Sequence, residues 1–473
     1  MAGVSSAQEQ ASGEWIVLGE DAAQSFTSAL AGEDDEAFSA VDSFQVYSSK
    51  NGLTAAKLDP SLENVLHRRM HVMHHRCGGY TVYPNLEQAL SELDNPNYSS
   101  GAQLGSGLFP TTIDQQMHVV PALGLVQSLE IISTIQSLQD LGNRYYNNPA
   151  GQTAALEILG KWQNYGHGRT DFSSRLVDHA WLQDSVVATI QGSEHPDEIV
   201  IIGAHLDSIN TRDNFAAPGA DDNASGIAVV SEVLRVLTAS DFRPKRTLEF
   251  MAYAAEEVGL RGSGDIAETY KREGKKVVAV LQIDMAGYRG SDRDLYFITD
   301  FVSEPLTNHL KSLISEYHSS GEHRITWGET ECGYGCSDHV SWTRNGFASA
   351  FPFEAKFDDY NPNIHTERDL LRAIDRTGQH QARFAKLGIT FMIELGKSAA
   401  TLRQLPRNRY IYTTLRAISS SASRGCRASD WACMTKLCKQ DLGASAWRGW
   451  AGCWQEDSRF TCSFECGAVM QSF

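Results

Sequence analysis

Long apolar runs are missing from this chain of 473 residues. No stretch of about eighteen apolar residues occurs, so no membrane-spanning helix is predicted. Residues 1–8 (MAGVSSAQ) also lack the basic region followed by an apolar region that marks a signal peptide. We therefore expect either export by another route or a signal sequence already removed from the chain.

Basic side chains are outnumbered, with 41 Lys and Arg against 58 Asp and Glu, and the formal net charge is −17. No Lys/Arg stripe occurs, and an acidic surface disfavours nucleic acid as a partner. The rest of the composition is that of a globular protein, with 42% hydrophobic and 21% charged residues. At this length two or three domains are expected.

Cysteine is scarce over the first 420 residues and crowded in the last 48. Such density in a short tail is typical of a disulfide scaffold and implies an oxidising compartment, secreted or periplasmic. The tail has no CxxC pair, which argues against a zinc module there. Six cysteines allow many pairings, and the sequence selects none of them. The tail cysteines are Cys426, Cys433, Cys438, Cys453, Cys462 and Cys466.

The first hundred residues look separate from the rest. Apolar segments at 15–18 and 44–47 predict strands, and a helix is predicted to begin at Asp59-Pro60 and to end before Gly78. The helix carries a His/Cys tract able to bind metal, although a polar helix face rich in His is the simpler interpretation. The tract comprises His67, His71, His74, His75 and Cys77.

Changes in composition divide the chain into parts. The Ser/Gly-rich stretch 98–107 predicts a linker open to proteolysis. A basic and then Ser-rich segment precedes the Cys-rich tail. The predicted parts are an N-terminal domain at 1–105, a main domain at 106–400, a linker at 401–425 and the tail at 426–473.

Helical and strand patterns alternate through the main domain. This alternation predicts βαβ units and an α/β fold with a mostly parallel sheet. Strands are expected at 185–190, 199–202, 247–253, 277–283, 294–298 and 348–353, and helices at 125–139, 154–163, 227–237 and 384–395.

The candidate functional residues follow these predicted strands. His205 follows the apolar run 199–202, Glu257 follows 247–253 and Asp284 follows 277–283. Asp222 lies between a strand and a helix, and His365 lies in a turn-rich loop. Because ligands bind at the carboxyl ends of strands in such sheets, we expect these groups to converge on a cation.

Two His and three carboxylates suit divalent ions such as zinc. The set is too rich for one catalytic zinc, which takes three protein ligands and a water. It fits two ions about 3.5–4 Å apart. Two divalent ions balance three carboxylates and a bridging hydroxide, and Asp222 is the carboxylate predicted to bridge.

Two further acidic residues have predicted roles beside these ligands. Asp207, two residues after His205, is placed to accept the free ring N–H of that imidazole, with a turn cap as the alternative. Glu256 and Glu257 are adjacent, so their side chains point in different directions. One is then a ligand and the other a general base beside the metal-bound water.

Six motifs in order resemble the secreted di-zinc leucyl aminopeptidases of bacteria and fungi, over about residues 111–396. The resemblance implies a three-layer αβα, zinc exopeptidase-like fold with a mixed, mostly parallel sheet, and removal of Leu or another large apolar residue from a peptide's free N-terminus. The motifs are 203–208 (GAHLDS), 218–226 (PGADDNASG), 252–263 (AYAAEEVGLRGS), 282–285 (QIDM), 332–339 (CGYGCSDH) and 361–365 (NPNIH).

The resemblance also implies a role for each site residue. Asp222 would bridge two zinc ions, His205 and Asp284 would complete one site, and Glu257 and His365 the other. The remaining roles are a general base at Glu256, a Cys332–Cys336 disulfide that holds Tyr334 near the reacting centre, and an apolar substrate pocket of Met285, Phe353, Phe357, Tyr360 and Ile364.

The family often carries an N-terminal pro-segment, and residues 76–80 resemble part of one. Residues 1–105 would then cover the main domain until cleaved, and the mature enzyme is expected to be monomeric. The role of the Cys-rich tail stays open. The alternatives are a one-zinc glutaminyl cyclase on the same scaffold, a carboxypeptidase, for which no anchoring Arg is evident, and an inactive binding protein.

Overall fold

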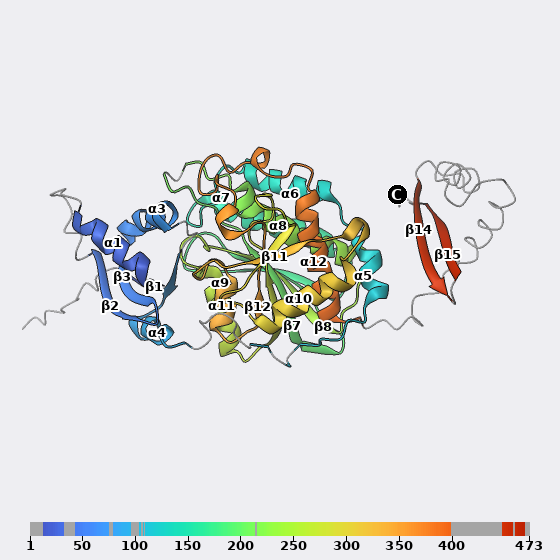
Figure 1. Cartoon of the computed structure of the whole chain (residues 1–473), viewed down its shortest axis with the longest axis horizontal. Coiled ribbons are helices and arrows are strands. Elements are labelled where there is room, and N and C mark those ends of the chain that lie inside the picture. Colours follow the sequence, from blue (N-terminus) through green and yellow to red (C-terminus); the bar gives the residue numbers. More distant parts are fainter. Residues whose placement is uncertain are drawn as a thin grey trace, which may run out of the picture. The chain divides into compact units, whose positions relative to one another are not determined.

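The computed structural model describes residues 13–32, 43–74, 79–95, 104–105, 107, 109–212 and 215–398, with strands β14 (Trp447–Glu456) and β15 (Arg459–Ala468) (Figure 1). The chain up to residue 399 forms one unit and the remainder a second one. In the second unit β14 and β15 are antiparallel, and Cys453 lies opposite Cys462. The predicted tail scaffold stays a prediction, because Cys426, Cys433 and Cys438 lie outside the described residues, as does Cys77.

A six-stranded mixed sheet forms the centre of the main domain. Its strand order is β12-β9-β7-β8-β6-β5, with β12, β9, β7 and β8 parallel and β6 and β5 antiparallel to their neighbours. The predicted α/β fold with a mostly parallel sheet is therefore confirmed. The strands are β5 (Phe172–Val177), β6 (Ser185–Ile190), β7 (His195–His205), β8 (Arg246–Tyr253), β9 (Lys276–Gln282) and β12 (Ser349–Ala350).

The apolar run of β7 is buried on both faces of the sheet. Val200 and Ile202 belong to the large core cluster on one face, and Ile199 and Ile201 to a smaller cluster on the other. Alternate side chains of a strand point to opposite faces, so each layer of helices takes every second residue. The large cluster includes α5 (Gln116–Leu123), α6 (Ser128–Asp140), α7 (Pro149–Gly166), α8 (Gly226–Ala239), α10 (Glu304–Tyr317) and α12 (Gln379–Gly396), and the smaller one α9 (Arg261–Arg272) and α11 (His339–Arg344).

The single strand predicted at 348–353 is wrong, because the chain changes sheets within it. Residues 349–350 pair with β9 as β12, whereas β13 (Pro352–Phe353) pairs with β10 (Leu295–Ile298) in a three-stranded sheet completed by β11 (Trp327–Thr330). Pro352 lacks an N–H and lies in an edge strand, the position that proline tolerates in a sheet.

Within the same unit, the described residues before 96 have a sheet and core cluster of their own, and this part is called the N-terminal domain. Its antiparallel sheet has the order β2-β3-β1-β4, and one core cluster joins this sheet to α1 and α3. The predicted helix start is confirmed, since Asp59 accepts a hydrogen bond from Ser61 N and Pro60 lies in the first turn. The elements are β1 (Glu14–Gly19), α1 (Glu20–Gly32), β2 (Phe44–Lys50), β3 (Leu53–Leu58), α3 (Glu63–His74), β4 (Tyr80–Tyr83) and α4 (Leu86–Glu92).

The histidines of α3 do not share one environment. His67 is buried, and its Nε2 lies 3.0 Å from the Tyr80 hydroxyl, so the polar-face interpretation is wrong for this residue. His74 instead faces Asp21 at 3.6 Å. The side chains of His71 and His75 lie outside the described residues.

Among the described residues, no single helix has the length and apolarity to cross a membrane; α5 and α6, bent by 66° at their break, meet the length and composition criteria only as a pair.

Candidate metal centre

The ligand candidates meet at one edge of the central sheet. His205 is the last residue of β7, Glu256 and Glu257 follow β8, and Asp284 follows β9. These three strands are parallel neighbours, so their carboxyl ends lie together. Asp222 joins them from the turn before α8, and all four ligand candidates named so far are buried, as is Glu256.

The two carboxylate oxygens of Asp222 face different histidines. Oδ1 lies 3.0 Å from His205 Nε2, which is also 3.3 Å from Asp284 Oδ1. Oδ2 lies 3.0 Å from His365 Nε2, which is also 2.8 Å from Glu257 Oε2. Ligand atoms of His205, Asp222 and Glu257 all lie within 4.8 Å of one another, so the two groups adjoin.

Three buried oxygens of this cluster accept no hydrogen bond from any described residue. They are Asp222 Oδ2 and both carboxylate oxygens of Glu257, and His365 Nε2 faces two of them, Asp222 Oδ2 at 3.0 Å and Glu257 Oε2 at 2.8 Å. A buried polar atom without a partner is costly. Imidazole nitrogens and carboxylate oxygens that converge in this way are suitable ligand atoms for a metal ion. This combination of histidine and carboxylate ligands suits zinc.

Charge is concentrated in this buried site. Burial and the nearby charge of Asp222 raise the pKa of Glu257 to about 7, and burial raises the pKa of Glu256 well above its usual range. Burial opposes ionisation of Asp222 as well, but its contacts with His205 and His365 outweigh this effect, and its pKa is lowered. Several buried carboxyl groups held together favour a cation among them.

Asp207 supports three site residues at once. Its carboxylate accepts the backbone N–H groups of Glu256 at 3.0 Å and Glu257 at 3.1 Å. The ring Nδ1 of His205 lies 3.2 Å from the Asp207 carbonyl oxygen and 3.4 Å from its Oδ1. Asp207 therefore orients the imidazole and also fixes the segment that follows β8.

Two supporting residues were missed by the sequence analysis. Asp369 accepts the backbone N–H groups of Asp221 and Asp222, each at 3.0 Å. Asn361 donates its side-chain amide to Asp221 Oδ2 at 2.9 Å, linking the loop of His365 to that of Asp222. Asn361 lies in the motif 361–365 (NPNIH), but Asp369 follows no predicted strand, and no sequence pattern indicated a role for it.

Arg144 was also missed, although it is fully buried. Its guanidinium donates to the carbonyl oxygens of Leu206 at 2.9 Å, Pro218 at 2.5 Å and Gly219 at 2.8 Å. It therefore holds together the two segments that carry His205 and Asp222. The backbone segments that it joins are remote from it in sequence, so no local pattern indicates its role.

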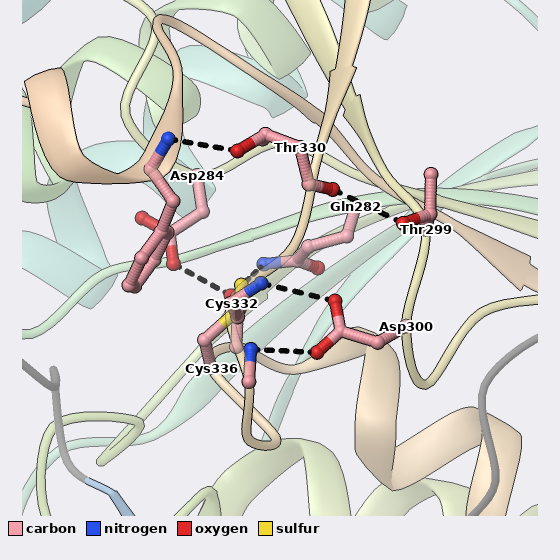
Figure 2. Close-up of a disulfide and its surroundings, with 10 residues drawn as sticks. Gln282, Asp284, Thr299, Asp300, Thr330, Cys332 and Cys336 are labelled. Atoms are coloured by element: carbon pink, nitrogen blue, oxygen red, sulfur yellow. Dashed lines mark hydrogen bonds between the residues drawn. A yellow bond between two sulfur atoms is a disulfide. The ribbon is translucent and has the colours of Figure 1, made fainter.

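The structure contains the Cys332–Cys336 disulfide expected from the resemblance (Figure 2). The carboxylate of Asp300 accepts the N–H groups of Cys332 at 3.0 Å and Gly333 at 2.7 Å (Figure 2). Just beyond the loop, Ser337 donates its hydroxyl to Asp284 Oδ2 at 2.6 Å. The disulfide loop is thus tied directly to a ligand candidate.

One apolar cluster surrounds this disulfide and contains all five residues expected to line the substrate pocket. Tyr334 belongs to the same cluster and meets the Phe357 ring edge-on, with 6.0 Å between centroids. Met285, one residue after Asp284, joins the cluster to the polar site. Within the cluster Met285, Phe353 and Ile364 are buried, and Phe357 and Tyr360 are partly buried.

Comparisons with known proteins identify the family of this chain. Residues 185–389 match the model of peptidase family M28. A probable leucine aminopeptidase of Arthroderma otae is 36% identical over 302 residues, which cover 63% of this chain and 81% of that protein. Leucine aminopeptidase 1 of Metarhizium robertsii is 36% identical over 303 residues, which cover 61% of this chain and 75% of that protein.

Solved structures from Legionella pneumophila are similar to this chain in fold and sequence. LapB from Legionella pneumophila matches with a TM-score of 0.68 and 29% identity, covering 81% of this chain and 100% of that one. The LapA aminopeptidase of the same organism matches with a TM-score of 0.68 and 27% identity, covering 83% and 100%. The chain therefore belongs to peptidase family M28 and is a metallo-aminopeptidase of the leucine aminopeptidase type.

Proposed function

We propose that this aminopeptidase holds two zinc ions that share Asp222. Zinc dependence is typical of family M28. The observation that carries the proposal is the orientation of Asp222, whose two oxygens lie 3.0 Å from two different histidines. His205 and Asp284 would complete one site, and Glu257 and His365 the other. When bound, such a pair polarises the scissile carbonyl and lowers the pKa of water.

Glu256 is the proposed general base. Its carboxylate is buried and reaches within 4.0 Å of His205 Nε2, while its backbone N–H is held by Asp207. It would accept a proton from the attacking water and return it to the nitrogen of the leaving amine. Tyr334, from the disulfide loop, is the proposed hydroxyl donor to the oxyanion.

The proposed site would restrict cleavage to the N-terminal end of a peptide. The free α-amine of a substrate would lie against the second ion and the surrounding acidic cluster, whereas an internal peptide bond offers no such amine. The adjoining apolar cluster would accept the first side chain of the substrate and favour Leu or another large apolar residue. The pocket walls are Met285, Phe353, Phe357, Tyr360 and Ile364.

The N-terminal domain is proposed as a pro-segment that covers the site until it is cleaved off. The support is its contact with the segment that carries the proposed base, where Val82 N donates to Gly259 O at 3.2 Å. Buried His67 of the same domain is close enough to His365 for the charge of that residue to influence its pKa. We propose that the mature enzyme is a monomer that acts outside the cell on peptides.

Glu256→Gln tests the proposed base. The variant keeps two equivalents of zinc by elemental analysis and an unchanged KM for leucyl anilide, but its kcat falls about 10²–10⁴-fold because proton transfer is lost. The control is Glu249→Gln, a buried carboxylate of β8 that accepts the Tyr270 hydroxyl at 2.8 Å and faces away from the site. Near wild-type kcat in Glu256→Gln would remove the base role, and a single equivalent of zinc would favour a cyclase-like site.

A further inference from the structure

Arg261 has a guanidinium that the main domain itself holds in place. Its Nε donates to the Val258 carbonyl oxygen at 2.7 Å, and the group lies over the Tyr146 ring, 5.5 Å from the centroid. One nitrogen is therefore used locally, and the guanidinium lies over an aromatic ring of the main domain. An Arg held in this way keeps its two terminal nitrogens available for a planar carboxylate.

Both terminal nitrogens bind carboxylates of the N-terminal domain. Nη1 and Nη2 of Arg261 meet the two oxygens of Glu14, each at 2.6 Å, and Nη2 also meets Glu63 at 3.0 Å. The side chain of Arg261 is only 11% exposed in this arrangement. If the N-terminal domain is removed, Glu14 and Glu63 are removed with it. Among the described residues, no carboxylate contact of the guanidinium then remains.

The backbone of Arg261 belongs to the turn that follows the proposed base. Its backbone N–H donates to Ala255 O at 3.0 Å, and Leu260 N donates to Glu256 O at 2.9 Å, so one tight turn carries both the proposed base and Arg261. Burial lowers the pKa of His67 to about 3, and the charges of His365 and Arg261 contribute in the same direction. His67 is thus within electrostatic reach of a ligand candidate and of Arg261.

We propose that Arg261 is a carboxylate-binding subsite for the peptide beyond the scissile bond, and that Glu14 and Glu63 occupy this subsite while the N-terminal domain is attached. The inference rests on the proposed aminopeptidase function and on removal of that domain. The ligand is a carboxylate, either the C-terminus of a short peptide or an acidic side chain. The two acidic residues then act as a mimic of the substrate's carboxylate.

The test uses the full chain with a site-specific protease sequence placed within residues 97–102. The chain also carries Glu14→Gln and Glu63→Gln, so that a retained fragment offers Arg261 no carboxylate. After cleavage, kcat and KM are measured for leucyl peptides of two to four residues as free acids and as C-terminal amides. A further pair, Leu-Ala-Asp-amide and Leu-Ala-Asn-amide, separates the acidic side chain from the C-terminus.

Arg261→Gln is expected to raise KM about tenfold for the carboxylate-bearing member of at least one pair. Its amide or Asn counterpart and leucyl anilide should change less than twofold. Arg344→Gln is the matched control, because this Arg also meets the N-terminal domain, 5.2 Å from the centroid of the Tyr83 ring, and should alter no pair.

Equal kinetics for every carboxylate and its uncharged counterpart would overturn the subsite, as would an equal loss on all substrates in Arg261→Gln. Leucyl anilide reports the proposed function separately. If no cleaved chain hydrolyses it, the proposed function fails, and the subsite falls with it.

Discussion

Asp222 can face two histidines only because its own backbone is fixed. Asp369 accepts its N–H and that of Asp221, and Asn361 ties the same loop to the loop of His365. None of these contacts touches a proposed ligand atom directly. Their effect is to hold the carboxylate of Asp222 where both of its oxygens point toward histidine nitrogens.

Asp369→Asn removes one of the two acceptor oxygens that hold this loop. We expect zinc affinity to fall about 10–100-fold, because groups that orient ligands contribute to affinity on this scale. Turnover of leucyl anilide should recover when zinc is added in excess, which a zinc titration measures. Asp375→Asn is the control, since this residue accepts the N–H groups of Thr377 and His380 instead. Unchanged zinc affinity in Asp369→Asn would contradict this role.

At this scale the sequence predicted the residues that meet but few of those that hold them. His205 ends β7, Glu257 and Asp284 come after β8 and β9, and strand order brings their positions together. Arg144 acts on carbonyl oxygens some 60 to 75 positions away in the chain. A contact made to remote backbone leaves no periodicity or motif, so it becomes visible only in the folded chain.

The elements of the N-terminal domain meet the main domain through a close backbone approach. Gly259 has φ +106° and lies so near β4 that an added Cβ would come within 2.7 Å of Val82 Cγ2. Glycine alone permits both the conformation and the contact. The predicted bounds of β6, β8 and β9 agree with the structure within one residue, whereas β7 extends well beyond the predicted 199–202 at both ends. The sheet change near Pro352 has no local signal beyond the proline.

Glu63, which contacts Arg261 from α3, is expected to make the stability of the N-terminal domain depend on pH. Burial raises its pKa to about 7 and outweighs the attraction of Arg261. Because the pKa in the folded chain is raised above the ordinary value of 4.5, the stabilising contribution is present below about pH 4.5 and is lost as pH rises through 7.

Glu63→Gln should therefore flatten the fall in stability of the N-terminal domain between pH 5 and 7. Wild type is expected to lose on the order of 2–3 kcal/mol over this range through Glu63 alone. Urea unfolding of the full chain at several pH values, followed by amide hydrogen exchange of β1 and β3, measures the difference. Glu87→Gln on α4 serves as an exposed control. Parallel pH profiles for wild type and Glu63→Gln would contradict this account.

Across the whole molecule, the buried carboxylates of the candidate metal centre are expected to couple metal binding to folding. An ion that binds only the folded chain stabilises it by mass action. Without the ion, Glu257 keeps two buried oxygens that accept no hydrogen bond from the described residues. We therefore expect the stability of the main domain to depend on whether this site holds a metal ion.

Chelation should lower the thermal midpoint of the main domain by about 10 °C, the shift expected for metal at roughly a thousandfold excess over Kd. Differential scanning calorimetry with and without chelator measures it, and added zinc should restore the original midpoint. In Asp222→Asn the chelator should have little further effect. A wild-type midpoint that is insensitive to chelator would show that the cluster is stable without metal.

The most direct measurement is anomalous diffraction from crystals of the zinc-loaded protein. Two peaks are predicted, one between His205 and Asp284 and one between Glu257 and His365, with Asp222 contributing one oxygen to each. A single peak, or two peaks that do not share Asp222, would contradict the account.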